Sequence, residues 1–155
     1  MRRLILGIVG VAVMSCAAPM SITTTAPATP TQAACDPSPL MTTENGLTEV
    51  QGTMHTEGEL WALLFFNQAW VDNELKIVWR VTGEGEFSVE ARHQEGTLIT
   101  VLGPIWGPEF HEGSNWERPG DEWGTGFNFP EPGCWTLMVK RGETIGEIRL
   151  KVLGS

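Results

Sequence analysis

The stretch WTLMVKRGETIGEIRLKV, residues 135–152, decides the fold class, because it holds two runs in which polar and apolar side chains alternate. The run EIRLKV at 147–152 alternates at every position, and the run WTLMVK at 135–140 has its tryptophan, leucine and valine on one face. A period of two is typical of a β-strand with one buried side. The residues Arg-Gly-Glu at 141–143 separate the runs, so we expect a β-hairpin here.

Further short runs precede the hairpin, and no stretch shows a sustained helical period of 3.6 residues. The run Leu60–Phe66 is apolar on both faces, which fits a buried helix segment or a central strand, and its strand neighbours favour the strand. The expected strands before the hairpin are Val50–His55, Leu60–Phe66, Leu75–Val81, Phe87–Arg92, Leu98–Leu102 and Gly126–Phe129. Short strands separated by Gly, Pro and Asn-Gly turns are typical of a sandwich or a barrel.

The motif FPEPGCW at 129–135 leads into the first strand of the hairpin. It resembles the segment that enters a central strand in immunoglobulin-like domains, which are two-layer β-sandwiches. We therefore predict an all-β fold, an immunoglobulin-like β-sandwich of about 7–9 strands, over residues 35–155. The length of 155 residues suits one such domain and leaves little room for a second.

The N-terminal residues predict export and lipid attachment. Arg2 and Arg3 precede the apolar run 4–14, which is typical of a secretory signal peptide and too short for a permanent membrane span. The tetrapeptide Val-Met-Ser-Cys at 13–16 resembles a bacterial lipobox. This resemblance implies cleavage before Cys16 and attachment of acyl chains such as palmitate to that residue. The alternative is an ordinary signal peptide that is cut elsewhere, with the cysteine incidental.

Residues 16–34 consist of this cysteine and a segment rich in Ala, Thr and Pro, with no charged or aromatic side chain. Such a composition cannot bury a core, so we predict a tether between a signal peptide at 1–15 and the folded domain. Lipid attachment then implies a protein held on the extracytoplasmic face of a bacterial membrane, with the membrane as a partner through the anchor.

The cysteine count agrees with export. Of the three cysteines, the lipobox accounts for Cys16, and Cys35 and Cys134 stand near the two ends of the predicted domain. In an oxidising compartment this pair predicts a disulfide bond, and two free thiols are the alternative.

The charge of the chain excludes one class of partner. The sequence has 10 basic and 19 acidic residues, a net charge of −9, and loss of the two arginines of the signal peptide leaves 8 against 19, or −11. A phosphate backbone repels such a chain, so we expect no nucleic-acid partner. The same charge disfavours adsorption to anionic lipid head groups.

A long connection between expected strands, residues 103–126, contains six Gly, three Pro, three of the seven Trp, five acids and one base. Connections of this length without structure of their own are uncommon in compact domains. Either it packs over the sandwich as a satellite core, or its indole rings and polar groups form a recognition surface, and both can hold. The candidate ligand-binding residues are Trp106, His111, Asn115, Trp116, Glu117, Arg118, Asp121 and Trp123.

The same region carries a family resemblance. The segments GSNWERPGDEWGT at 113–125, FP at 129–130, GCW at 133–135 and KRG at 140–142 resemble a pattern in small, uncharacterised bacterial lipoproteins. Those proteins share a C-terminal immunoglobulin-like domain, and the resemblance extends best over residues 100–153. It implies a sandwich displayed at the cell surface, and it brings no assigned catalytic or binding residues.

The titratable side chains show no clear metal or catalytic motif. The three histidines lack metal-ligand spacing, so we expect no metal cofactor and no catalytic residue. The acids that could form a calcium site are Glu112, Glu117, Asp121 and Glu122, although they lack the calcium-loop pattern. The soft ligands that could form a copper site are Met41, Met54 and His55.

Two functions from other classes therefore stand beside the favoured one. We expect a membrane-anchored, non-enzymatic lipoprotein that presents its Trp-rich acidic loop to a protein or a cell-envelope glycan. The alternatives are an exported calcium- or copper-binding lipoprotein and a small cell-wall glycan hydrolase. The hydrolase would use Glu117 or Glu122 as one of two carboxylates.

Overall fold

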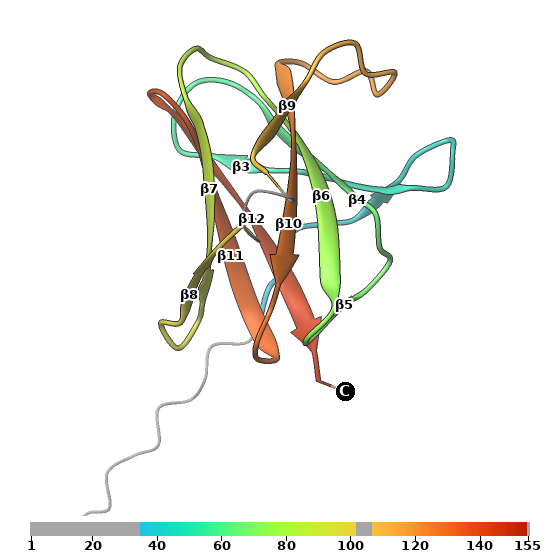
Figure 1. Ribbon diagram of the computed structural model, residues 1–155, viewed down its shortest axis with the longest axis vertical. Helices are drawn as coiled ribbons and strands as arrows, with labels where there is room; N and C mark the ends of the chain where they lie inside the picture. The colour runs from blue at the N-terminus through green and yellow to red at the C-terminus, as the bar shows by residue number, and fades with distance from the viewer. Residues whose placement is uncertain (1–34, 102–106, 155) are drawn as a thin grey trace, which may run out of the picture. The chain divides into compact units, whose positions relative to one another are not determined.

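The computed structural model describes residues 35–101 and 107–154 (Figure 1). Over these ranges it contains strands and no helix, and so no helix long and apolar enough to cross a membrane. The strands are β1 (Met41–Thr42), β2 (Thr48–Gln51), β3 (Thr53–Met54), β4 (Leu60–Leu64), β5 (Ala69–Trp70), β6 (Glu74–Val81), β7 (Phe87–His93), β8 (Leu98–Thr100), β9 (Glu109–His111), β10 (Asp121–Asn128), β11 (Gly133–Arg141) and β12 (Thr144–Leu153). The predicted signal peptide, Cys16, the tether and Trp106 lie outside the described residues.

The strands form two sheets that face each other as a β-sandwich, which confirms the predicted all-β fold. Sheet A has the order β1-β2-β4-β6-β10-β9, and sheet B has the order β3-β12-β11-β7-β8 (Figure 1). Every pairing along these two paths is antiparallel, and the short β5 adds to β12 in parallel. The chain passes between the sheets at several points, so β10 lies beside β6 and β11 lies beside β7.

The predicted hairpin is confirmed as β11 and β12. Its register pairs Arg141 with Thr144 at the turn and Trp135 with Leu150 farther along. The alternation seen in the sequence places one side of each strand in the core, with Trp135, Leu137 and other inward residues fully buried. Full burial of one such large apolar side chain contributes about 1.5–3 kcal/mol, so the hairpin supplies a large part of the core.

The two fully buried indole groups of the core, those of Trp79 and Trp135, satisfy their one polar atom. Trp79 in β6 donates from Nε1 to Thr125 Oγ1 at 2.7 Å, and Trp135 in β11 donates from Nε1 to the Glu131 carbonyl at 3.1 Å. A buried donor without a partner would cost about 1–3 kcal/mol, so these bonds permit full burial of both rings.

The strand boundaries differ most from prediction in two places. The expected strand Val50–His55 is two strands in different sheets, β2 and β3, with Gly52 between them. A Cβ at Gly52 would lie 2.6 Å from Leu60 Cδ2, so the residue must be small where the chain leaves sheet A. The expected Gly126–Phe129 strand begins earlier, as β10, because its small residues hide the alternation. Among the described residues, seven strands have four or more residues, and five shorter ones raise the total to twelve.

Cys35 and Cys134 are joined by a disulfide bond, with Cα atoms 5.2 Å apart, as the sequence predicts. The bond connects the segment ahead of β1 to the first residues of β11, which are 99 positions away in the chain.

Reduction of this disulfide is expected to lower the free energy of unfolding by roughly 4–5 kcal/mol, because the oxidised bond restricts a loop of about 100 residues in the unfolded chain. Urea unfolding of oxidised and reduced protein measures the difference. A Cys35→Ala/Cys134→Ala variant is the matched control and should match the reduced protein. Equal midpoints for oxidised and reduced protein would contradict this prediction.

Candidate functional site

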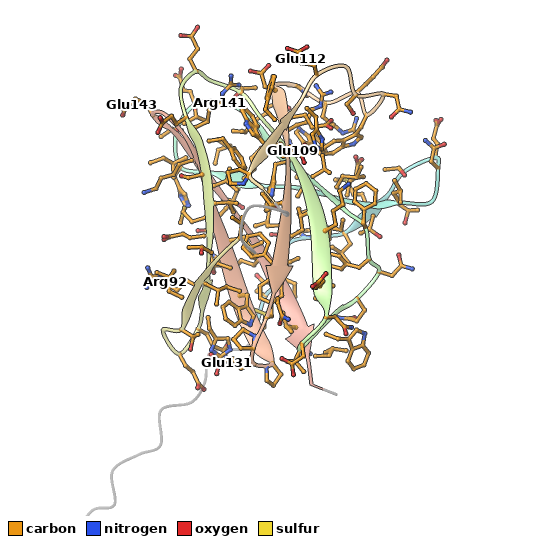
Figure 2. The ribbon with its side chains drawn as sticks, in the orientation of Figure 1. Arg92, Glu109, Glu112, Glu131, Arg141 and Glu143 are labelled. Atoms are coloured by element: carbon orange, nitrogen blue, oxygen red, sulfur yellow. A yellow bond between two sulfur atoms is a disulfide. The ribbon has the colours of Figure 1, made fainter. Side chains whose placement is uncertain are left out.

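The described part of the Trp-rich connection, residues 107–126, is more regular than the sequence predicts, because it contains β9 and the start of β10. His111 in β9 pairs with Glu122 in β10, so the irregular part is the loop 112–120. This loop lies beside β9 and β10 at one end of the sandwich (Figure 1). Glu109 and Glu112 lie toward this end, whereas Glu131 lies at the opposite end (Figure 2).

One buried carboxylate fixes the loop on sheet A. Glu49 in β2 is only 4% exposed, and it faces away from sheet B because its neighbour Val50 belongs to the core. Its Oε1 forms an ion pair with Arg118 Nη2, and its Oε2 accepts a hydrogen bond from Trp116 Nε1 at 3.0 Å. Both loop side chains therefore depend on the same carboxylate.

The outer face of sheet A supports the guanidinium of Arg118. Its Cζ lies 4.4 Å from the ring centroid of Trp61 in β4, a cation–π contact. The Trp61 ring is in turn oriented by a bond of 3.0 Å from its Nε1 to Glu59 Oε2. The Arg118 side chain thus lies between the Trp61 ring and the buried Glu49 carboxylate, and these contacts hold the adjoining loop backbone against sheet A.

A second arginine holds the backbone of the same loop. Arg80 in β6 donates from Nη1 to the carbonyls of Arg118 and Gly120, at 3.1 and 2.9 Å. Its Nε donates to Glu122 Oε2 at 3.3 Å, and Glu122 Oε1 lies 3.2 Å from His111 Nδ1. Both ends of the loop are therefore fixed by contacts with strands of sheet A.

A pocket of about 430 Å³ opens between this loop and the turn that joins β1 to β2. The turn is closed by hydrogen bonds of Thr43 with Leu47. We call this cavity the loop pocket; its lining residues are Thr43, Glu44, Asn45, Leu47, Glu49, Leu63, Asn115, Trp116, Glu117 and Arg118. It therefore combines one indole, two amides, a hydroxyl and carboxylates around a partly apolar floor.

Four of the eight predicted binding residues line the loop pocket, and three others do not. His111 contacts Glu122 within the β9–β10 pair, and Asp121 forms an ion pair with Arg141. Trp123 is 8% exposed, and its ring stacks on Phe87 with centroids 4.6 Å apart. The expectation that Trp123 offers a face to a ligand is thus corrected, because the strand alternation of β10 turns its ring into the core.

Two parts of the site could not be predicted from the sequence. Glu49 stands just before the expected strand Val50–His55, and its burial comes from a loop more than sixty positions away. The turn at 43–47 carries only an Asn-Gly signal, which predicts a turn and no binding role.

The structure separates the residues predicted for the alternative functions. Asp121 and Glu122 bind different arginines, Arg141 and Arg80, so the proposed calcium ligands do not converge. His55 Nε2 lies 3.0 Å from Glu147 Oε2, whereas Met54 packs against the core. Within residues 35–101 and 107–154, one group of metal-ligating side chains lies close together, and it contains none of these residues.

Of the two glutamates named for the hydrolase alternative, Glu122 is likewise engaged by other side chains. Glu122 is buried in its contacts with Arg80 and His111 and does not line the loop pocket, while Glu117 does.

Comparison with protein-family models and with curated proteins finds no significant match to this chain.

Removal of the Arg118 guanidinium, as in Arg118→Ala, is expected to destabilise the protein by roughly 3 kcal/mol, because it leaves the Glu49 carboxylate buried without its cation. Urea unfolding measures this loss. The control is Arg92→Ala, which removes an exposed ion pair with Glu90 and should cost less than about 1 kcal/mol. Equal effects of the two substitutions would show that Glu49 does not depend on Arg118.

Proposed function

We propose that the protein is an exported bacterial lipoprotein, attached to the extracytoplasmic face of a membrane through Cys16, whose sandwich binds a cell-envelope glycan or protein in the loop pocket. The leader at 1–15, the lipobox and the uncharged tether support export and attachment. The Cys35–Cys134 bond agrees with an oxidising compartment.

The observation that carries the binding role is the fixed geometry of the loop pocket. The indole of Trp116 is oriented by its hydrogen bond to the buried Glu49, so ligand binding loses little further conformational entropy of this side chain. Asn115 from the loop and Asn45 from the facing turn bring amide donors and acceptors to the same cavity. An aromatic ring beside short polar groups suits a sugar ring or a peptide.

The charge of the loop pocket limits the ligands it accepts. Glu49 and Arg118 neutralise each other, whereas the exposed Glu44 and Glu117 form no ion pair among the described residues. Two unpaired carboxylates repel an anion, so neutral or positively charged groups are favoured. A binding role is further favoured over catalysis because the second carboxylate named for hydrolysis, Glu122, is engaged elsewhere.

We also propose that the sandwich is immunoglobulin-like. The order β4-β6-β10-β9 in sheet A corresponds to strands A, B, E and D of such domains, and β8-β7-β11-β12 corresponds to an added edge strand followed by C, F and G. The parallel pairing of β5 with β12 is compatible with this assignment. The disulfide differs from the one in antibody domains, which joins strands B and F, because Cys35 lies ahead of the strands and Cys134 lies in β11.

Titration of the purified full-length protein with soluble peptidoglycan fragments tests the binding role. We expect saturable binding by calorimetry, weakened at least about tenfold by Trp116→Ala, because loss of a central aromatic contact costs more than 1.4 kcal/mol. The matched control is Trp70→Ala, since Trp70 is 41% exposed in β5 and outside the loop pocket. Equal affinities of the two variants would contradict a site at the loop pocket.

Fractionation of cells tests the anchor independently of the ligand. In the Cys16→Ser variant the thiol that would carry the lipid is absent, so the protein should leave the membrane fraction and lose labelling by radioactive palmitate. The control, Cys35→Ser, should keep both properties. Retention of Cys16→Ser in the membrane fraction would contradict the lipoprotein assignment.

A further inference from the structure

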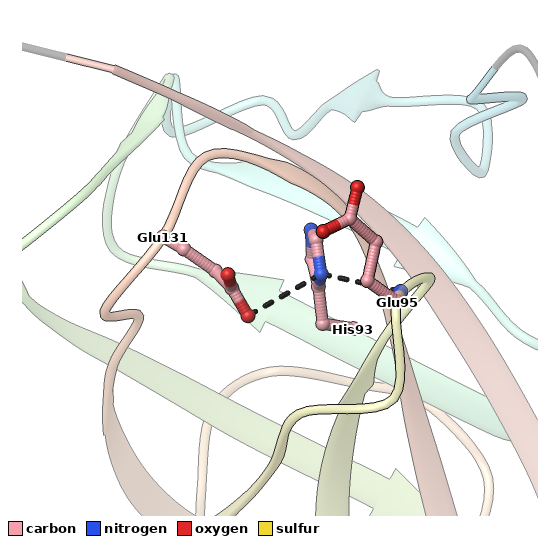
Figure 3. Close-up of side chains that lie close together, drawn as sticks. All are labelled: His93, Glu95 and Glu131. Atoms are coloured by element: carbon pink, nitrogen blue, oxygen red, sulfur yellow. Dashed lines mark hydrogen bonds and ion pairs between the residues drawn. The ribbon is translucent and has the colours of Figure 1, made fainter. Parts of the chain in front are cut away.

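A second cluster of polar side chains lies at the other end of the sandwich from the loop pocket. His93 ends β7, Glu95 lies in the turn that follows, and Glu131 lies in the turn before β11 (Figure 3). One potential ligand atom from each of the three side chains lies within 4.8 Å of the other two. None of these residues was singled out by the sequence, because the two turns are 36 or more positions apart.

The imidazole of His93 is fixed with one nitrogen directed at the carboxylates. The ring is 3% exposed, and Nε2 lies 3.2 Å from the Pro132 carbonyl oxygen. Because a carbonyl only accepts, Nε2 carries the hydrogen, and the lone pair of the neutral ring is on Nδ1. The Glu95 backbone N–H donates to that nitrogen over a long 3.3 Å. A histidine whose second nitrogen donates to a backbone carbonyl is the arrangement usual for metal ligands.

The carboxylate of Glu131 supplies the second observation. Its Oε1 is buried and has no hydrogen-bond donor, yet it lies 3.3 Å from His93 Nδ1. A proton on Nδ1 would join these two atoms in an ion pair, and a metal cation between them would balance the same contact. Bonds of about 2.0–2.1 Å to a tetrahedral ion place two ligand atoms roughly 3.4 Å apart, so the observed separation fits such an ion.

The surrounding backbone holds both ligands in place before any ion binds. Trp135 Nε1 donates to the Glu131 carbonyl at 3.1 Å, and Gln94 N donates to the Cys134 carbonyl at 3.0 Å. Gly133 has a φ of +138°, and a Cβ there would lie 2.3 Å from His93 Nε2. The glycine therefore permits the close approach that directs the ring toward the two glutamates.

We infer that His93, Glu131 and Glu95 form a binding site for a divalent transition-metal ion of the Zn²⁺ type. His93 and Glu131 hold their ligand atoms at the required spacing, and a carboxylate oxygen of Glu95 lies within 4.8 Å of a ligand atom of each. An imidazole nitrogen with carboxylates selects such ions over Mg²⁺ and Ca²⁺, which prefer oxygen ligands alone. The bound ion would join the turn after β7 to the turn before β11.

Calorimetry with a tag-free, EDTA-treated full-length protein tests this site. We expect uptake of one Zn²⁺ per chain, no response to Ca²⁺, and a loss of affinity of at least about tenfold in Glu131→Gln, which keeps the size of the side chain. The matched control is Glu109→Gln, because Glu109 stands 4.0 Å from another histidine, His111, and should leave the affinity unchanged.

Thermal unfolding distinguishes loss of the ligand from loss of the fold. Zn²⁺ should raise the Tm of the parent protein and of Glu109→Gln but not that of Glu131→Gln, whose Tm without metal should stay close to the parent value. The inference is overturned if Zn²⁺ uptake is absent, if Glu131→Gln binds as the parent does, or if Glu109→Gln removes the binding instead.

Discussion

Strand β11 is the constraint on which the rest of the structure depends, because both ends of the sandwich are built from its contacts. It pairs along its length with β12 and β7, and its inward residues fill the core. At its start, Cys134 carries the disulfide and Trp135 stands opposite His93. At its end, Arg141 forms an ion pair with Asp121 and lies 4.8 Å from the ring centroid of Trp123. The alternation of this strand therefore fixes the core, while its two ends contact the surroundings of His93 and the first residues of β10.

The order of the loop 112–120 has a different physical origin, the burial of charge. Apolar contacts alone would leave a loop rich in glycine and proline free to adopt many conformations. Glu49 and Glu122 are nearly excluded from water, and an isolated buried carboxylate is costly, so Arg118 and Arg80 must stay in contact with them. Their replacement by apolar residues need not lower stability, but it would remove the directional contacts that give the loop one conformation.

Patterns in the sequence predicted the structure correctly where it depends on residue types and their spacing along the chain. The period of two in 135–152 predicts the hairpin, and two cysteines near the domain ends predict the disulfide. Strand β10 was underestimated because both faces are covered and its centre, Gly124 to Gly126, carries small residues that show no alternation. The clusters at Glu49 and His93 could not be found in this way, since their partners are 67 and 38 positions distant and no local rule relates them.

The two clusters also differ in their position relative to the point where the chain enters the domain. The first described residue, Cys35, is bonded to Cys134 and lines a shallow cavity together with His93. Glu112, the first residue of the loop 112–120, lies toward the other end of the sandwich (Figure 2). In a protein attached ahead of Cys35, tension on the chain would pass through the disulfide into β11, a strand paired on both sides. The loop pocket is at the end of the sandwich remote from Cys35 and its disulfide.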